Sequence, residues 1–382
     1  MKGSDKIKVL VVDDSVLVRK YVCLILKELE NIDVVGIAHN GKIGLEKIIL
    51  YKPDVVILDV EMPEMTGLEL LKYLKTCSDR IPLPFIIMFS SLLEEGSATA
   101  IEALNYGAAD IIKKPDGKIS ENFDYLKKEF ELKINGLYQS KTETRKSYLP
   151  YSEDLTEEIV PCAYPAVVRG IENLMELMTK KPIKPELIAI ASSTGGPPAI
   201  RKILENLSEL KIPVVIAQHM PQGFTREFAK NLSSGFNREV LELTPERELK
   251  NGVIYICPGG VHSKIAKEGN SLFYQADYGN YEGFFFKPSI DIFFRSIINS
   301  VGKNTIGIVL SGMGKDGSVE SVNLRKEGAV MIAQDEESSA IWGMPGSSVR
   351  NGGIDIILNI YDIGKAINIL LSGNKTIKHL LI

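Results

Sequence analysis

Three aspartates stand at the ends of apolar runs in the first part of the sequence. Asp13 and Asp14 follow KVLVV, and Asp59 closes DVVILD. If these runs are parallel strands, their carboxyl ends meet at one edge of the sheet, so we expect the three carboxylates to share a pocket there. Three carboxylates repel one another unless a hard cation lies between them, and Mg²⁺ accepts such ligands while keeping waters for a phosphate group. The pattern therefore predicts acyl-phosphate chemistry at one of the aspartates.

Two more polar residues end the next runs of this half. Ser90 closes PFIIMFS, and Lys114 follows DIIK, directly before Pro115. A hydroxyl and an ammonium group at the same edge suit contacts to a bound phosphoryl group. Taken separately, an Asp-Asp pair is more often a helix N-cap, and a Lys-Pro step is more often a simple strand exit. Because all five residues fall at strand ends, we favour a phosphorylation site.

A serine, a histidine and an aspartate hold equivalent positions in the second half. Ser193 follows the run LIAIAS, His219 follows PVVIAQ, and Asp316 lies in SGMGKDG after TIGIVL. A serine hydroxyl is a weak nucleophile near neutral pH and needs a base, and an imidazole base needs a carboxylate to fix its tautomer. The spacing predicts that these three residues form a nucleophile, a base and an orienting acid at one sheet edge.

The turn that carries Ser193 leaves two interpretations open. The Gly195-Gly196 pair permits a sharp reversal, and the following prolines begin a helix, so Ser193 is expected at a helix N-terminus. The N–H groups there suit either the oxyanion of an acylation reaction or a bound phosphate. His262, in PGGVHSK, is a second conceivable acid or base, for which we favour a structural or substrate-side role.

Short apolar runs alternate with helix-length amphipathic segments in both halves. This alternation predicts two doubly wound, mainly parallel α/β sheets, and the uniformly apolar strands of the second half indicate a sheet covered on both faces. The stretches QSKTETRKS, YLPYSED and KKPIKP between them are typical of a linker, with one short helix near residues 166–179. We therefore expect a first domain over 1–137, a linker over 138–183, a second domain over 184–372 and a tail over 373–382.

Composition excludes several classes of protein. The 382 residues carry a formal net charge of -4 at pH 7, which gives no basic footprint for a nucleic acid. No apolar run approaches the roughly 18 residues that a membrane span needs, so we expect a cytoplasmic protein without membrane insertion. The 4 cysteines stand far apart without a CxxC spacing, which indicates neither a zinc site nor a disulfide framework.

The motifs VVDDS, VILDVEMPEMTG, MFSS and KKP together resemble the response-regulator receiver family over about residues 5–136. The resemblance implies a flavodoxin-like sheet in which Asp59 accepts a phosphoryl group from a chemotaxis histidine kinase. It also implies that Ser90 and Lys114 form the switch pair. Ile111 stands where the family usually has an aromatic switch residue, so this chain departs from the pattern there. The implied surroundings of Mg²⁺ are Asp13, Asp14, Asp59 and the backbone carbonyl of Glu61.

The motifs SSTGGPPAI, QHMPQGFT, CPGG, KPSIDIFF, SGMGKDG and IAQDEESSAIWGMP resemble the catalytic domain of the chemotaxis protein-glutamate methylesterases, the CheB family, over about residues 184–370. The resemblance implies an acyl-enzyme at Ser193, with His219 as general base and acid and Asp316 as its orienting residue. It further implies an oxyanion hole that uses the Met313 backbone N–H, supported by Thr194. The order Ser, His, Asp and the absence of G-x-S-x-G separate this triad from that of the α/β-hydrolases.

The resemblance implies phosphorylation-activated hydrolysis of glutamate γ-methyl esters on methyl-accepting chemotaxis receptors, together with glutamine deamidation. Mg²⁺ would serve receiver phosphorylation, and ester hydrolysis itself would need no cofactor. Two departures fall near the site: Ala191 replaces a usual glycine before the serine turn, and FFFKPSID stands where a histidine-arginine pair often precedes Pro-Ser. The remaining alternatives are a regulator with a nucleotide- or phosphate-binding second domain, and a phosphorylated adaptor that only docks receptors.

Overall fold

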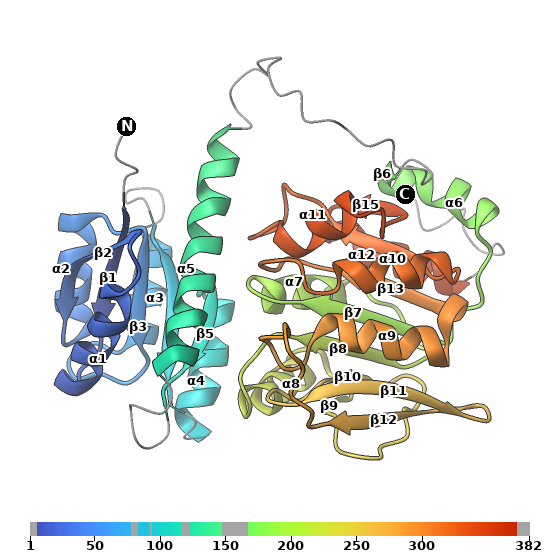
Figure 1. Cartoon of the computed structure of the whole chain (residues 1–382), viewed down its shortest axis with the longest axis horizontal. Coiled ribbons are helices and arrows are strands. Elements are labelled where there is room, and N and C mark those ends of the chain that lie inside the picture. Colours follow the sequence, from blue (N-terminus) through green and yellow to red (C-terminus); the bar gives the residue numbers. More distant parts are fainter. Residues whose placement is uncertain (1–5, 78–82, 92–93, 116–122, 147–166, 373–382) are drawn as a thin grey trace. The chain divides into compact units, whose positions relative to one another are not determined.

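The chain forms two compact units, Met1–Ser147 and Tyr148–Ile382 (Figure 1). The computed structural model describes residues 6–77, 83–91, 94–115, 123–146 and 167–372. The predicted tail and the middle of the predicted linker lie outside the described residues. Within the described ranges, none of the helices combines the length and apolar character that crossing a bilayer requires.

The first unit is built on a five-stranded parallel sheet in the order β2-β1-β3-β4-β5. Helices α1 and α5 pack together, and α3 contacts both α2 and α4. The central strands are almost wholly buried because helices cover the sheet. The strands are β1 (Ile7–Val12), β2 (Ile32–Ala38), β3 (Val55–Asp59), β4 (Phe85–Ser90) and β5 (Asp110–Lys113), and the helices are α1 (Val16–Lys27), α2 (Gly41–Tyr51), α3 (Gly67–Thr76), α4 (Glu94–Asn105) and α5 (Phe123–Lys146).

Side-chain caps begin the first three helices close after the strands that precede them. The Ser15 hydroxyl accepts the Val18 N–H that opens α1, and the Asn40 side chain accepts the Ile43 N–H of α2. Thr66 and Glu69 form a reciprocal capping box at the start of α3. These caps satisfy N–H groups that a helix start leaves without partners, and they fix where each helix begins after the carboxyl edge of the sheet.

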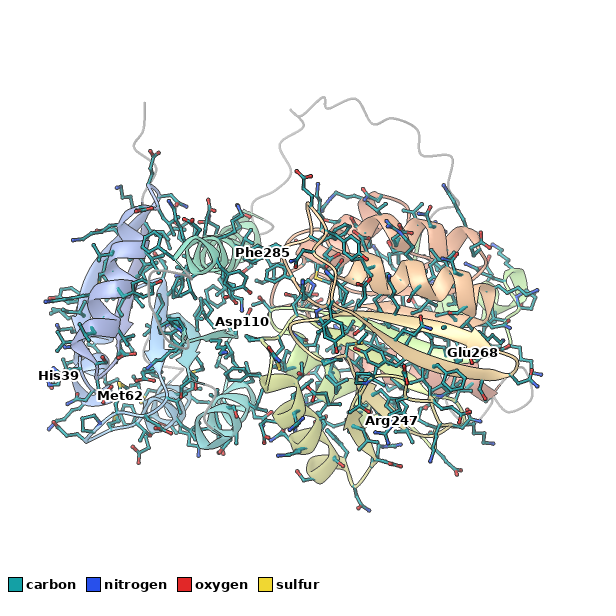
Figure 2. All side chains as sticks on the ribbon, turned by 60° about the horizontal axis from the view of Figure 1, so that its bottom comes forward. His39, Met62, Asp110, Arg247, Glu268 and Phe285 are labelled. Carbon is teal, nitrogen blue, oxygen red and sulfur yellow. The ribbon has the colours of Figure 1, made fainter. Side chains whose placement is uncertain are left out.

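The second unit contains an eight-stranded sheet in the order β6-β15-β14-β13-β7-β8-β10-β9, in which all seven pairings are parallel. A separate antiparallel hairpin, β11-β12, packs on helix α9 and turns after Glu268 (Figure 2). The strands are β6 (Val168–Arg169), β7 (Leu187–Ser192), β8 (Val214–Gln218), β9 (Val240–Glu242), β10 (Ile254–Ile256), β11 (His262–Glu268), β12 (Ser271–Asp277), β13 (Thr305–Val309), β14 (Val330–Gln334) and β15 (Ile356–Leu358).

Helices cover the large sheet in two groups. Helix α10 contacts both α9 and α11, whereas α7 contacts both α8 and α12. The buried side chains of β7, β8 and β13 fill the core between these groups. The helices are α6 (Leu174–Lys180), α7 (Gly196–Glu205), α8 (Phe224–Phe236), α9 (Ile290–Ser300), α10 (Ser318–Lys326), α11 (Gly343–Arg350) and α12 (Ile360–Ser372), with short 3₁₀ turns at Ile171–Asn173 and Gly302–Asn304.

The predicted pair of doubly wound, mainly parallel α/β folds is confirmed, but two details differ from the sequence-based expectation. The boundary predicted at residue 137 falls inside α5, which continues to Lys146 through a segment without glycine or proline. The segment predicted as linker contains the expected short helix, as α6, but it also contributes the edge strand β6, whose backbone pairs with β15. The β11-β12 hairpin is a further element that the alternating pattern does not predict.

Candidate active site

Three neighbouring strands of the second unit lead into loops that carry polar residues. Strand β7 lies between β13 and β8, and Ser193 and His219 follow β7 and β8 directly. Asp316 lies in the loop that joins β13 to α10. Parallel strands of one sheet bring these three loops to the same edge, where open α/β sheets place their sites.

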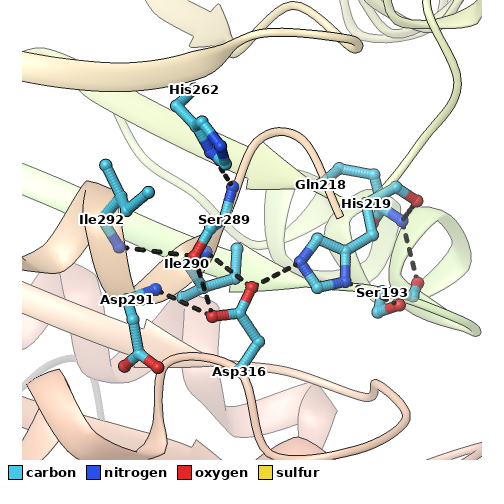
Figure 3. Close-up of polar contacts among 9 residues, drawn as sticks. All are labelled: Ser193, Gln218, His219, His262, Ser289, Ile290, Asp291, Ile292 and Asp316. Carbon is cyan, nitrogen blue, oxygen red and sulfur yellow. Dashed lines mark hydrogen bonds and ion pairs between the residues drawn. The ribbon is translucent and has the colours of Figure 1, made fainter. Parts of the chain in front are cut away.

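The three side chains form a continuous hydrogen-bonded chain (Figure 3). Nδ1 of His219 lies 3.2 Å from Oγ of Ser193, and Nε2 lies 3.0 Å from Oδ2 of Asp316. An ionised carboxylate only accepts, so Nε2 carries the proton and Nδ1 offers a lone pair to the serine hydroxyl. Ser193 and His219 are only 3% and 4% exposed, which keeps bulk water from competing for these bonds.

Asp316 is held by the N-terminus of helix α9. Its carboxylate accepts hydrogen bonds from the Ser289 hydroxyl at 3.1 Å, the Ile290 N–H at 2.8 Å and the Asp291 N–H at 3.0 Å. Burial by itself would raise the pKa of Asp316, but the hydrogen bond and charge of His219 and the two backbone N–H donors bring this pKa below its ordinary value. Asp316 therefore stays ionised, and its negative charge can stabilise an imidazolium at His219.

The turn after β7 fixes Ser193 from several sides. The Ser193 N–H donates to the Ser311 carbonyl at 3.0 Å, and the Ser193 carbonyl accepts from Gln218 Nε2 at 2.9 Å. Gly195 adopts φ 78°, and a Cβ on Gly196 would lie 2.2 Å from Oε1 of Gln218. Both glycines are required by this geometry, because a side chain would strain the first and collide at the second.

The loop that contains Met313 lies beside the serine. A Cβ on Gly312 would lie 2.9 Å from the Ser193 Cβ, so the two backbones are close together. Among the described residues, none accepts a hydrogen bond from the Met313 N–H. The Ser311 hydroxyl donates to the Thr194 carbonyl at 2.8 Å and thereby joins this loop to the serine turn. The arrangement leaves one backbone donor available next to Ser193.

The first unit brings Asp13, Asp14 and Asp59 together at the carboxyl edge of its own sheet. One carboxylate oxygen from each lies within 4.8 Å of the others. Nζ of Lys114 lies 2.8 Å from Asp13 Oδ2 and 2.7 Å from Asp59 Oδ1. Burial, opposed by Lys114 and reinforced by Asp13, raises the pKa of Asp59 to about 6. The donor set is all oxygen, as Mg²⁺ requires, so these residues fit the predicted ion.

Comparisons with known proteins find relatives for both units of the chain. The sequence matches the CheB methylesterase family over residues 188–367 and the response regulator receiver domain family over residues 9–122. A protein of Pyrococcus horikoshii named protein-glutamate methylesterase/protein-glutamine glutaminase is 35% identical over 388 residues, with 99% of this chain and 98% of the relative covered. The protein of the same name in Trichodesmium erythraeum is 35% identical over 365 residues, with coverage of 95% and 98%. The chain belongs to this family.

The solved catalytic domain of the CheB methylesterase of Thermotoga maritima is 32% identical, covers 49% of this chain and 99% of its own, and has a TM-score of 0.46. In the receiver unit of this methylesterase-family chain, Ser90 contacts the segment that carries Lys114. The buried Ser90 accepts the Lys114 N–H at its carbonyl oxygen at 2.7 Å. Glu61 is exposed two residues beyond Asp59, and Ile111 is buried within β5.

Sequence reasoning missed one aromatic residue of the candidate site. The Phe286 ring stacks on the His219 imidazole, with 4.5 Å between ring centroids and 22° between the planes. The Phe285 ring meets Phe286 edge-on. In the sequence, the run FFFK before Pro288 stands out only as a departure from the family pattern, and nothing in its spacing indicates a contact with a histidine some 70 residues earlier. The stack shields one face of the His219 imidazole from water.

Proposed function

We propose that this chain hydrolyses glutamate γ-methyl esters on methyl-accepting chemotaxis receptors, by a Ser-His-Asp mechanism that phosphorylation of Asp59 activates. We include deamidation of glutamine at the same kind of site. The observation that carries the proposal is the buried hydrogen-bonded chain from Ser193 through His219 to Asp316. Two near-full-length relatives named for both activities support the choice of substrate.

In the proposed acylation, Oγ of Ser193 attacks the ester carbonyl while Nδ1 of His219 takes the hydroxyl proton. The imidazolium that forms keeps its Nε2–H bond to Asp316, whose ionised carboxylate offsets the new charge. The tetrahedral intermediate collapses when its C–O bond to the methoxy group breaks, and the His219 imidazolium gives its Nδ1 proton to the departing methoxy oxygen, which leaves as methanol. Ser193 then carries the glutamyl acyl group.

The oxyanion of this intermediate needs hydrogen-bond donors that are already in place. We assign the Met313 N–H to this role, because it lies next to Gly312 in the loop packed against Ser193. Thr194 supports it, since its carbonyl is bound by the Ser311 hydroxyl of the same loop. A preorganised donor of this kind contributes about 10²–10³ in kcat in serine hydrolases.

Deacylation repeats these steps with water as the nucleophile. His219 removes a proton from the water, the acyl–Oγ bond breaks, and Ser193 recovers its proton while a glutamate carboxylate leaves. With a glutamine side chain, ammonia replaces methanol as the first leaving group. The chain's own residues account for each proton, so hydrolysis requires no cofactor.

In the receiver unit, Asp59 is the proposed acceptor of a phosphoryl group from a chemotaxis histidine kinase. Asp13, Asp14, Asp59 and the Glu61 carbonyl would hold Mg²⁺, which when bound neutralises charge between the carboxylates and the phosphoryl group. Lys114 pairs with Asp13 and Asp59. After phosphorylation, its ammonium group would bind the phosphoryl oxygens on Asp59. Ser90, adjacent in the sheet edge, is its proposed partner in the switch.

Hydrolysis converts a neutral ester into an anion on the receptor. Such a change of local charge biases a two-state signalling equilibrium, which gives the reaction its proposed use in chemotactic adaptation. Phosphorylation at Asp59 would set the rate of this conversion by shifting the conformational equilibrium of the chain.

The test measures methanol released from methylated chemoreceptor membranes, with and without a small phosphodonor. We expect release that rises with phosphodonor in the intact chain, vanishes in Ser193→Ala and persists without stimulation in Asp59→Asn. Absence of release from the phosphorylated chain contradicts the esterase proposal. In that case tight nucleotide binding would favour a binding module, and receptor binding that survives Ser193→Ala would favour an adaptor.

A further inference from the structure

A second histidine lies behind the catalytic carboxylate. His262 begins strand β11 and is fully buried. Its Nδ1 lies 3.1 Å from the Ser289 backbone nitrogen, which is a donor. A backbone N–H can only donate, so Nδ1 of His262 must be the unprotonated acceptor. Figure 3 shows this contact between His262 and Ser289. The ring is therefore neutral, with its proton on Nε2.

Ser289 connects this ring to the triad. It is the N-cap of α9, where its hydroxyl oxygen accepts the Ile292 N–H and its hydroxyl proton is directed to Asp316 Oδ1. The next two backbone N–H groups, of Ile290 and Asp291, also bind the Asp316 carboxylate. The orientation of three donors to Asp316 thus depends on where the Ser289 backbone is held.

We propose that His262 is a positioning residue of the hydrolase site: as the neutral Nε2–H tautomer it accepts the Ser289 N–H, fixes the start of α9 against Asp316, and so orients His219. This inference rests on the proposed hydrolysis by Ser193. We assign His262 no part in proton transfer, because its Nδ1 already accepts the Ser289 backbone N–H.

The surroundings of His262 keep it neutral. Burial and the positive charge of Lys287 lower the pKa of His262 below its ordinary value. The Tyr281 ring packs beside it at 5.5 Å between centroids. Among the described residues, none accepts a hydrogen bond from Nε2. A proton added at Nδ1 would face the Ser289 N–H, donor against donor, which disfavours the cation. The charged groups near the ring are Lys287, Asp277, Asp316 and Lys264.

Three replacements separate this role from simple packing. Asparagine places its amide oxygen near the position of Nδ1, whereas glutamine reaches instead toward the position of Nε2, and leucine fills the space with no acceptor. If His262 acts through the Ser289 N–H, His262→Asn keeps kcat for methanol release within about threefold. His262→Gln and His262→Leu lose about ten- to a hundredfold in kcat with little change in KM, since each leaves a buried donor without a partner.

The measurement uses the full chain with methylated receptor membranes, and circular dichroism confirms that each variant is folded. Equal losses in the asparagine and glutamine variants overturn the inference. An intact protein that releases no methanol at all overturns the proposed function instead, so the two failures are distinguishable.

A second readout does not depend on activity. Long-range ¹H–¹⁵N spectra of the wild-type chain at pH 7, with His262 assigned by comparison with a variant, report the tautomer directly. We expect an unprotonated Nδ1 and a protonated Nε2. A protonated Nδ1 is incompatible with the Ser289 bond and overturns the inference.

Discussion

The imidazole of His219 is oriented by contacts on three sides. Ser193 and Asp316 bind its two nitrogens, and Phe286 covers one face. Asp316 in turn keeps its pKa below the ordinary value, because donors from His219 and α9 outweigh the effect of burial. The carboxylate therefore stays ionised through the neutral pH range, and it can stabilise the imidazolium throughout that range.

Replacement of Asp316 by asparagine tests this point. An amide at that position can donate to Nε2, which favours the tautomer with the proton on Nδ1 and removes the base from Ser193. We expect kcat for methanol release to fall by about 10³–10⁴, with KM little changed. The matched control is Asp362→Asn, on α12, which should keep wild-type rates. A loss below about tenfold would show that Asp316 does not orient the base.

The pKa of Asp59 is shifted in the opposite direction from that of Asp316. Its pKa is raised to about 6, and burial is the largest cause. The folded receiver therefore favours the protonated carboxyl more than the unfolded chain does. A carboxyl whose folded-state pKa lies above its unfolded value contributes stability below the unfolded pKa, and this contribution is lost as pH rises through the folded value. Between about pH 4 and pH 6, ionised Asp59 therefore becomes a cost to folding in the absence of a cation.

Asp59→Asn should remove that cost. We expect the free energy of unfolding of the receiver strands to rise by about 1–3 kcal/mol at pH 7.5 and to change little near pH 4. Hydrogen exchange of β1 and β3 in the full chain, with a chelator present, measures the effect. The exposed Asp33 on β2 provides Asp33→Asn as the control for loss of one charge. A gain that is equal at both pH values would contradict the raised pKa.

At the scale of elements, strand ends were the most predictable feature. Apolar runs such as DVVILD and PVVIAQ determine where strands end, so the positions of Asp59 at the end of β3 and of His219 directly after β8 follow from the sequence. The contacts supplied by tertiary packing could not be predicted from the sequence. Strand β6 has two residues and exists only because β15 pairs with it, and the donors to Asp316 come from a helix that packs beside its loop. Neither contact leaves a periodic signal.

The close approach of the β13 loop to the serine turn gives a prediction at this scale. A Cβ on Gly312 would lie 2.3 Å from the Met344 sulfur and 2.9 Å from the Ser193 Cβ, so the loop must shift in Gly312→Ala. Because a displacement of about 1 Å can cost about 10²-fold, we expect a loss of about that size in kcat. Gly235→Ala, within α8 and facing only the flexible end of Arg201, is the control and should retain activity. Equal activity of the two variants would mean that the loop accommodates the methyl group.

At the scale of the whole molecule, each unit has its own sheet and its own site at a carboxyl edge. The predicted start of the second domain at residue 184 leaves out parts of the second sheet. The Val168 N–H donates to the Asp355 carbonyl at 3.2 Å, and the Gly170 N–H donates to the Ile357 carbonyl at 3.1 Å. Nζ of Lys181 pairs with Asp355 at 2.9 Å. A catalytic fragment should therefore begin before β6.

Two fragments test both the boundary and the proposed control by the receiver. A fragment beginning at Tyr148 keeps β6 and Lys181, and one beginning at residue 184 loses them, so we expect the shorter fragment to be less stable toward urea by about 1–3 kcal/mol. If the unphosphorylated receiver restrains the hydrolase, the longer fragment releases methanol faster than the unstimulated full chain and no longer responds to phosphodonor. Rates are compared at equal protein concentration, with Ser193→Ala in the longer fragment as the blank. A fragment that is no faster than the unstimulated full chain would contradict the proposed restraint by the unphosphorylated receiver. It would indicate instead that the phosphorylated receiver itself increases the activity of the hydrolase.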